Sequence, residues 1–258
     1  MRIGLLTVAI AASACAGNPS QPSPDRPVET RQALEPVGLV PFNDQPWTRL
    51  TGNGWAYLRR TSSKDADIAS DATAPFSPPD VLRIVFTPSM TRDTEPSVDW
   101  LRLPQRPREV YARWWMKLSA NWTPSPAGGG KITFLHAEPS GQGQVYTGLF
   151  GASAPHHISV NTEWAPYGQK IWSPNVTTSP VSYDRWYEVD WYVKWASGEA
   201  ADGILRWWVD GVLNGDYTSV TFPARGTGFQ QFEFAPTLQN PPPEEQYMYI
   251  DHTYLSAR

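Results

Sequence analysis

Hydrophobic and polar residues alternate along most of the chain that follows Leu39. The alternating runs are short and are separated by Pro, Gly and Asn, and none shows the 3.6-residue periodicity of an amphipathic helix. A period of two is typical of strands with one buried face. Strands are therefore predicted at residues 55–59, 81–87, 98–103, 109–118, 131–136, 144–150, 156–161, 186–195, 204–209, 229–234 and 247–255. This pattern predicts an all-β, two-sheet jelly-roll sandwich.

Segment 185–211 shows the alternation most clearly. In the first of its two strands Tyr187 and Trp191 share an apolar face, and charged and aromatic residues share the other face. The second strand repeats this arrangement. Asp210 and Gly211 follow it directly and predict a tight hairpin turn.

Strand 109–118 has the same two-faced character. Trp114 and Met116 lie on its apolar face, and Arg113 lies on the other face among aromatic and basic residues. Aromatic rings set among charges suit a pyranose, which has an apolar C–H face and a polar rim. We therefore expect a glycan-binding surface formed by Tyr111, Trp115, Lys117, Trp186, Lys194, Arg206, Trp208 and Gln231. The alternative is that loops cover these aromatic side chains, which then serve only packing.

Length and composition predict one folded domain over residues 39–258. The chain of 258 residues is 40% hydrophobic and contains 13 Trp and 11 Tyr, which suffices for one large core. Its net charge of −4 argues against a nucleic-acid-binding protein, because such a protein needs a basic surface to neutralise phosphates. The expected partner is a polysaccharide.

The N-terminus has the pattern of an export signal. An apolar run from Ile3 to Ala12 is followed by Ser-Ala and then by Cys15, the only cysteine. This order predicts a signal peptide over residues 1–14 and a bacterial lipoprotein lipidated at Cys15, and the alternative is ordinary cleavage and secretion. Residues 15–38 are rich in Pro, Ser and Gln, which predicts a disordered tether. We expect an extracytoplasmic protein that is anchored to the membrane through Cys15.

Several stretches of sequence resemble one family of polysaccharide-cleaving enzymes. They read YARWWMKLSANW at 111–122, KITFLHAE at 131–138 and WYEVDWYVKWASGEAADGILRWWVDGVL at 186–213. In this order they are similar to the concanavalin-like jelly-roll polysaccharide lyases of the heparin-lyase and glucuronan-lyase kind. YMYIDHTYLSA at 247–257 resembles the last strand of many concanavalin-like domains. The resemblance spans roughly residues 105–257. It supports the prediction of the fold better than a prediction of the reaction.

The resemblance implies a β-elimination that needs three groups in one groove. A cation or amide neutralises the uronate carboxylate, a base removes the neighbouring proton, and an acid protonates the leaving oxygen. The family's Gln-x-His strand falls on Phe134-Leu135-His136, and its late Lys- and Tyr-bearing strand on 232–236, so only the histidine matches. The catalytic candidates are therefore His136 as base, Tyr146 or Tyr192 as acid and Arg113 as neutraliser. A hydrogen-bonded, partly buried structural histidine is the alternative for His136.

Other kinds of site have less support in the sequence. Glu188 and Asp190 alternate as the catalytic carboxylates of jelly-roll glucanases do, but the third carboxylate is missing, so we expect both to be solvated. No cofactor and no catalytic metal are expected. A structural calcium ion could bind at Asp210, Asn214 and Asp216, although turn chemistry alone explains these residues.

Three functions are consistent with the sequence. The leading hypothesis is polysaccharide recognition through an aromatic and basic groove, to which Arg113, Trp115, Lys117, Tyr192 and Trp208 contribute. The alternative is cleavage of a uronate-containing glycan by β-elimination. The third is a non-catalytic structural surface lipoprotein whose aromatic side chains are merely packed.

Overall fold

The structure is a computed structural model that describes residues 34–60, 65–125, 128–138, 143–164, 168–198, 200–222 and 228–258. The predicted signal peptide, Cys15 and most of the predicted tether lie outside these residues. Strands are the regular elements of the described part of the chain. It contains no helix of the length and apolar character needed to cross a membrane.

The described residues form fifteen strands. They are β1 (Val40–Gln45), β2 (Trp55–Arg60), β3 (Ala66–Ser70), β4 (Asp80–Phe86), β5 (Ser97–Arg102), β6 (Glu109–Leu118), β7 (Gly129–Glu138), β8 (Gln144–Phe150), β9 (His157–Trp164), β10 (Gly168–Trp172), β11 (Tyr187–Lys194), β12 (Gly203–Val209), β13 (Val212–Val220), β14 (Gly228–Leu238) and β15 (Gln246–Ala257). All eleven predicted strands are present, within a few residues of their predicted ends. The sequence patterns did not predict β1, β3, β10 and β13.

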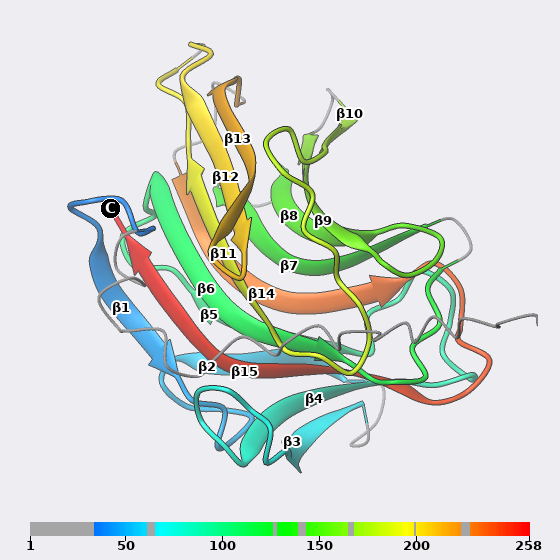
Figure 1. The fold of residues 1–258 in the computed structure, drawn as a ribbon. Helices are drawn as coiled ribbons and strands as arrows, with labels where there is room; N and C mark the ends of the chain where they lie inside the picture. Colours follow the sequence, from blue (N-terminus) through cyan, green and yellow to red (C-terminus); the bar gives the residue numbers. More distant parts are fainter. Residues whose placement is uncertain are drawn as a thin grey trace, which may run out of the picture.

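The strands form two antiparallel sheets that enclose one core, and the long strands β6, β7, β14 and β15 are visibly bent (Figure 1). The eight-stranded sheet has the order β13-β12-β11-β6-β15-β4-β3, and β1 pairs with the C-terminal half of β15. The seven-stranded sheet has the order β10-β9-β8-β7-β14-β5-β2. This arrangement confirms the predicted all-β sandwich of two sheets.

Aromatic side chains fill the space between the sheets. Trp114, Trp191 and Trp207 are fully buried in this core, as the alternation of their strands predicts. Trp47 and Trp55 pack edge to face with their ring centroids 4.8 Å apart. Rings of this size each remove a large apolar area from water, which is the main favourable term in folding.

The strand β7 contains one extra residue relative to its neighbour β8. Lys131 pairs with Gly148 and Thr133 with Thr147, so the register shifts between them at Ile132. Ile132 and Thr133 are both fully buried. This β-bulge changes the phase of the alternation, and Lys131 therefore lies on the same outer face as residues further along the strand.

The hairpin between β12 and β13 depends on two glycines. Asp210 and Gly211 both have positive φ (52° and 76°) and form the predicted two-residue turn. Gly215 lies opposite Trp207 in the hairpin, and a Cβ atom on Gly215 would lie 2.0 Å from the Trp207 ring. Trp207 is held in place, because its Nε1 donates to the Ile158 carbonyl at 3.1 Å.

We expect Gly215→Ala to lower the free energy of unfolding by about 1–3 kcal/mol, because the added methyl group overpacks a side chain that cannot move aside. Urea unfolding of the full chain measures this loss. Ser219→Ala, at an exposed position of the same strand, is the control and should change stability by less than about 0.5 kcal/mol. Equal stability of both variants would contradict the proposed clash.

Candidate functional site

The predicted aromatic and basic surface lies on one sheet except for Gln231, which belongs to β14 of the seven-stranded sheet and corrects that part of the prediction. Strand β6 is the neighbour of β11, and β11 is the neighbour of β12, so all three belong to the eight-stranded sheet. Tyr111 pairs with Tyr192, and Tyr192 with Arg206, across these strands. Apart from Gln231, the prediction of which side chains share a face is confirmed.

This surface is covered rather than open, which corrects the prediction of an exposed sugar platform there. Trp115 and Trp208 retain only 6% and 8% of their exposure, and Tyr111 retains none. Leu34 and Leu39, from the chain before β1, pack against the cluster that contains Tyr111 and Trp208. Rings buried in this way cannot stack on a sugar unless the covering segments move.

The loop that follows β3 covers the neighbouring part of the same face. The Lys117 ammonium pairs with the Asp71 carboxylate, and Trp186 Nε1 donates to Thr73 Oγ1 at 3.2 Å. Burial raises the pKa of Asp71, but the hydrogen bonds from Lys117 and Thr73 together lower it by more. Its pKa therefore lies below the ordinary value. Lys117 and Trp186 thus hold a loop in place in this structure.

Arg113 lies in a buried network of charges. Its Nε donates to Asp190 Oδ1 at 2.7 Å and lies 3.1 Å from Glu188 Oε1. Tyr111 donates to the same Asp190 oxygen, and burial together with the Asp190 charge raises the pKa of Tyr111. Glu188 and Asp190 are buried, so the prediction that they are solvated is wrong: Arg113 compensates their charge inside the protein.

The remaining residues of this surface also have protein partners. Tyr192 Oη donates to Glu109 Oε2 at 2.8 Å, and burial and this carboxylate raise the pKa of Tyr192. Arg206 Nε donates to Asp216 Oδ1 at 2.6 Å. Lys194 is partly exposed at the end of β11.

The four catalytic candidates do not lie together. His136 on β7 and Tyr146 on β8 belong to the seven-stranded sheet, and Arg113 and Tyr192 belong to the eight-stranded sheet. Both pairs face outward, with the core between them. Arg113 and Tyr192 therefore cannot act on the same sugar as His136.

Polar side chains cross the outer face of the seven-stranded sheet in a continuous row. Each residue of this polar row is the direct cross-strand partner of the next: Arg102, Gln231, His136, Gln144, Glu163 and Gln169. Strands lie about 4.8 Å apart, so six strands extend the row over roughly 24 Å. The row runs perpendicular to the strands.

A second row runs beside the polar row and is more aromatic. It consists of Trp100, Glu233, Phe134, Tyr146, Asn161 and Ile171, again in cross-strand order. The Phe134 and Tyr146 rings lie 5.2 Å apart. These two rows, called here the polar row and the aromatic row, form the candidate site.

His136 is the partly exposed histidine of the polar row. Its side chain is 27% exposed, and its Nε2 lies 2.7 Å from Glu233 Oε1. The Phe134 ring stacks almost parallel to the imidazole, with centroids 5.7 Å apart and an interplanar angle of 8°. His136 is thus hydrogen-bonded and partly buried, and part of its ring is still accessible on the outer face.

Tyr146 forms the floor of a cleft of about 400 Å³ that is also lined by Asn161, Glu163 and Gln169. The Gln169 amide donates to Tyr146 Oη. The Lys131 ammonium lies 4.8 Å from the Tyr146 ring centroid. Burial and the Glu163 charge raise the pKa of Tyr146 to about 12, so the phenol keeps its proton at neutral pH.

Two carboxylates of the site are too far apart for glycoside hydrolysis. Glu233 on β14 and Glu163 on β9 are separated by β7 and β8, or roughly 14 Å at the usual strand spacing. Retaining and inverting glycosidases need carboxyl groups about 5–9.5 Å apart. The pair therefore does not supply the nucleophile and acid of a glycosidase.

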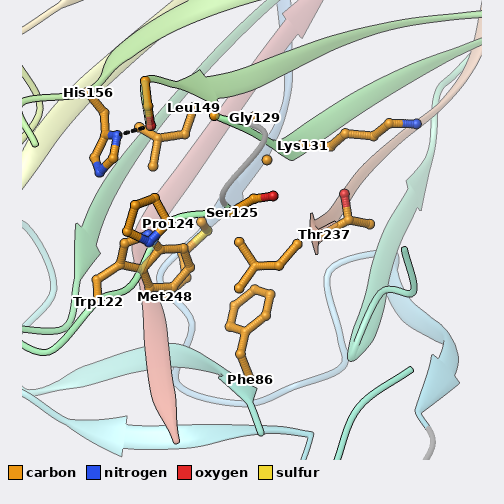
Figure 2. Close-up of a pocket in the computed structure, with 14 residues that line it drawn as sticks. Phe86, Trp122, Pro124, Ser125, Gly129, Lys131, Leu149, His156, Thr237 and Met248 are labelled. Carbon is orange, nitrogen blue, oxygen red and sulfur yellow. Dashed lines mark hydrogen bonds between the residues drawn. The ribbon is translucent and has the colours of Figure 1, made fainter. Parts of the chain in front are cut away.

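A second hollow lies inside the sandwich and is shown in Figure 2. Trp122, Leu149 and Met248 line it, together with His156, whose Nδ1 hydrogen-bonds the Gly151 carbonyl at 2.9 Å. Its volume of about 10 Å³ is close to that of one probe sphere, which leaves room for one water molecule at most. Burial lowers the pKa of His156, so this histidine is neutral at neutral pH. The hollow is too small for a substrate.

The residues considered for calcium are engaged with the protein. Asp210 Oδ2 accepts from Arg185, and Asp216 Oδ1 accepts from Arg206. Asn214 exchanges hydrogen bonds with Ser179. Among the described residues, no group of three or more His, Cys, Asp or Glu side chains is arranged to hold a metal ion.

Of the residues in the two rows, the sequence predicted only His136, Tyr146 and Gln231 as site residues. Glu233, Gln144 and Lys131 are the missed residues that matter most for the chemistry of the site. Glu233 lies between two core phenylalanines, in a strand where the family resemblance points only to Lys and Tyr. Gln144 begins β8 and pairs with His136 only because of the strand register, and its amide donates to Glu163 Oε2 at 3.0 Å. Lys131 reaches the same face through the bulge in β7. Alternation along β7 and β14 predicts which side chains point outward, but no signal in the sequence predicts which strands pair with each other or in what register.

Solved structures of similar fold include polysaccharide lyases. An endo-β-1,4-glucuronan lyase from the fungus Trichoderma reesei superposes with a TM-score of 0.58 at 17% identity, over 80% of this chain and 92% of that chain. A marine PL-14 alginate lyase from Aplysia kurodai gives a TM-score of 0.53 at 12% identity, over 75% of this chain and 87% of that chain. The cellulose-induced protein Cip1 gives 0.54 at 11%, over 79% and 91%.

These similarities show that the chain has the jelly-roll fold found in polysaccharide lyases, as the sequence resemblance implied. At such low identity they show the fold alone. No protein-family model matches the sequence, and no curated protein matches it.

We expect Arg113→Met to lower the free energy of unfolding by about 3–5 kcal/mol, because Asp190 and Glu188 would remain buried without their cation. Denaturant unfolding measures the loss. Arg206→Met removes a half-exposed pair with Asp216 and should cost no more than about 1 kcal/mol. If the two variants lost the same stability, Arg113 would not be the buried structural cation described above.

Proposed function

We propose that this protein is a polysaccharide lyase that cleaves a uronate-containing glycan by β-elimination on the outer face of the seven-stranded sheet. The observation that carries the proposal is the placement of His136 and Tyr146 on neighbouring strands of one face, with Gln144 and Lys131 beside them. These side chains supply the base, the acid, an amide and a cation that the reaction requires.

The reaction assigns one step to each group. His136 takes the proton from the uronate carbon that bears the carboxylate, and the electron pair forms a double bond to the adjacent carbon. The bond from that carbon to the glycosidic oxygen breaks, and the oxygen takes its electron pair and a proton from Tyr146. Proton exchange with water returns His136 to the neutral form and Tyr146 to the phenol.

The strand register supports these roles. Gln144 is the direct partner of His136, at the roughly 5 Å that separates cross-strand neighbours. Tyr146 is the diagonal neighbour of His136, about 7–8 Å away at the backbone, so a sugar ring can lie between the base and the acid. The Gln169 amide donates to Tyr146 Oη, which leaves the phenol proton for the leaving oxygen.

Neutralisation of the carboxylate differs from the family pattern. The glutamine of the Gln-x-His strand is replaced by Phe134, and here Gln144 on the next strand is proposed to supply the amide. Lys131 places a positive charge 5.5 and 4.8 Å from the Phe134 and Tyr146 ring centroids, and the Glu163 carboxylate lies 3.7 Å from the same ammonium. Both rings are themselves buried, so they pack beneath the polar groups of the face and do not stack on the sugar.

The fold similarity agrees with this proposal at a coarse level. Two of the similar structures are named as lyases of acidic polysaccharides, and Cip1 is not named as an enzyme. Glycan recognition without cleavage therefore remains the second function, and the polar row supports it because hydrogen-bonding side chains line up over six strands.

We also propose that the protein works outside the cytoplasm, attached to a membrane through Cys15. Support comes from the apolar run before Cys15 and from a substrate that is too large to enter a cell. A tether rich in Pro and Ser would hold the folded domain away from the membrane surface.

The full chain should release unsaturated, ultraviolet-absorbing products from at least one uronate polymer, such as polyglucuronate or polymannuronate. His136→Ala should lower the rate by at least about 10²-fold, because general base catalysis typically contributes that much. His157→Ala, at the far end of β9, is the matched control and should keep full activity. A folded protein that retains the polymer but releases no product would instead support glycan binding without cleavage.

In a bacterial host, Cys15→Ser should move the protein from the membrane fraction to the soluble exported fraction and should abolish labelling with a fatty-acid precursor. Cell fractionation with antibody detection measures this change. If the unsubstituted protein were already soluble and unlabelled, secretion without an anchor would replace the lipoprotein proposal.

A further inference from the structure

The Glu233 carboxylate lies directly beside the imidazole of His136. Glu233 is the cross-strand partner of Phe134, and His136 is two residues further along β7 on the same face. Glu233 Oε1 is 2.7 Å from His136 Nε2, and the Glu233 side chain is only 8% exposed. A carboxylate this deeply buried requires hydrogen bonds to replace its lost hydration.

Each carboxylate oxygen of Glu233 has a partner. Oε1 accepts from His136, and Oε2 accepts from Gln231 Nε2 at 2.5 Å. Gln231 is in turn the cross-strand neighbour of His136 in the polar row. The amide therefore holds the carboxylate in place, and the carboxylate holds the imidazole.

This contact determines which ring nitrogen carries the proton. An ionised carboxylate only accepts hydrogen bonds, so the neutral imidazole must present Nε2–H to Glu233. The lone pair then resides on Nδ1. Among the described residues Nδ1 has no hydrogen-bond partner, and the His136 side chain is partly exposed.

The orientation of the ring is fixed from a second side. Phe134 stacks on the imidazole at an interplanar angle of 8°, so the ring cannot turn about its axis without losing this contact. A base that is held in one tautomer and one orientation needs no rearrangement at the moment of proton transfer.

We propose that Glu233 is a positioning residue that holds His136 with Nε2 protonated, so that Nδ1 is the atom that removes the substrate proton. This inference rests on the proposed lyase function and deepens it. When Nδ1 takes the proton, the imidazole becomes a cation, and the Glu233 charge stabilises it through the same hydrogen bond. Gln231 then supports Glu233 rather than the sugar.

Kinetics of Glu233→Gln test the proposal. The amide has nearly the same shape but lacks the charge and can donate to the imidazole, which favours the wrong tautomer. We expect kcat to fall on the order of 10²-fold, with KM changed by no more than about threefold, because the residue does not touch the substrate. Gln231→Leu should give a smaller loss of kcat, since Glu233 keeps its bond to His136.

Asp67→Asn is the matched control. Asp67 is a paired carboxylate on β3 of the other sheet, where it accepts from Arg83 at 2.9 Å. This variant should retain the kcat of the unsubstituted chain. Circular dichroism and thermal unfolding of each variant establish that the comparison is made between folded proteins.

Nitrogen NMR of the His136 ring tests the inference independently of activity. The unsubstituted chain should show the tautomer with Nε2 protonated, and Glu233→Gln should reduce its population. Protonation at Nδ1 in the unsubstituted chain, or an unchanged tautomer and kcat in Glu233→Gln, would overturn the proposal. If the unsubstituted chain cleaves no polymer, the lyase function fails, and the NMR result still decides whether Glu233 positions His136.

Discussion

The register of the hydrogen-bond ladder that joins β14, β7 and β8 is the constraint on which the candidate site depends. Each strand supplies side chains to the outer face at every second residue, and the pairing decides which of them become neighbours. His136 lies between Gln231 and Gln144 because of this pairing alone. A slip of one residue would send His136 toward the core and dismantle the site.

The same alternation of side chains produces a covered outer face on one sheet and an outer face with an open cleft on the other. On the eight-stranded sheet, aromatic rings and charges are closed off by neighbouring segments, and the charges compensate one another, as Arg113 does for Asp190. On the seven-stranded sheet a cleft stays open above Tyr146. Composition of a face therefore does not distinguish a packed surface from a binding surface; what covers the face does.

Much of the fold could be predicted from alternation, and much of the site could not. The faces of β6, β11 and β12 follow from their period of two, which local sequence contains. The missed strands lack that signal: β10 is short and mostly exposed, and β13 is interrupted by Asn214 and Gly215. Sheet membership depends on pairing between distant segments, so the separation of His136 from Arg113 could not be read from either strand. The contact between Glu233 and His136 could not be predicted for the same reason, because the two residues lie on different strands.

The bulge at Ile132 has a consequence for how this protein can be compared with others. Lys131 and Phe134 share a face although three positions separate them, an odd spacing that an uninterrupted strand would place on opposite sides. Without the extra residue, the lysine ammonium would enter an apolar interior and lose its hydration. An alignment without a gap at this point would equate Lys131 with a core residue of a related strand. A comparison of aligned positions would then miss Lys131 as the cation of the cleft, although its position in space would be the same.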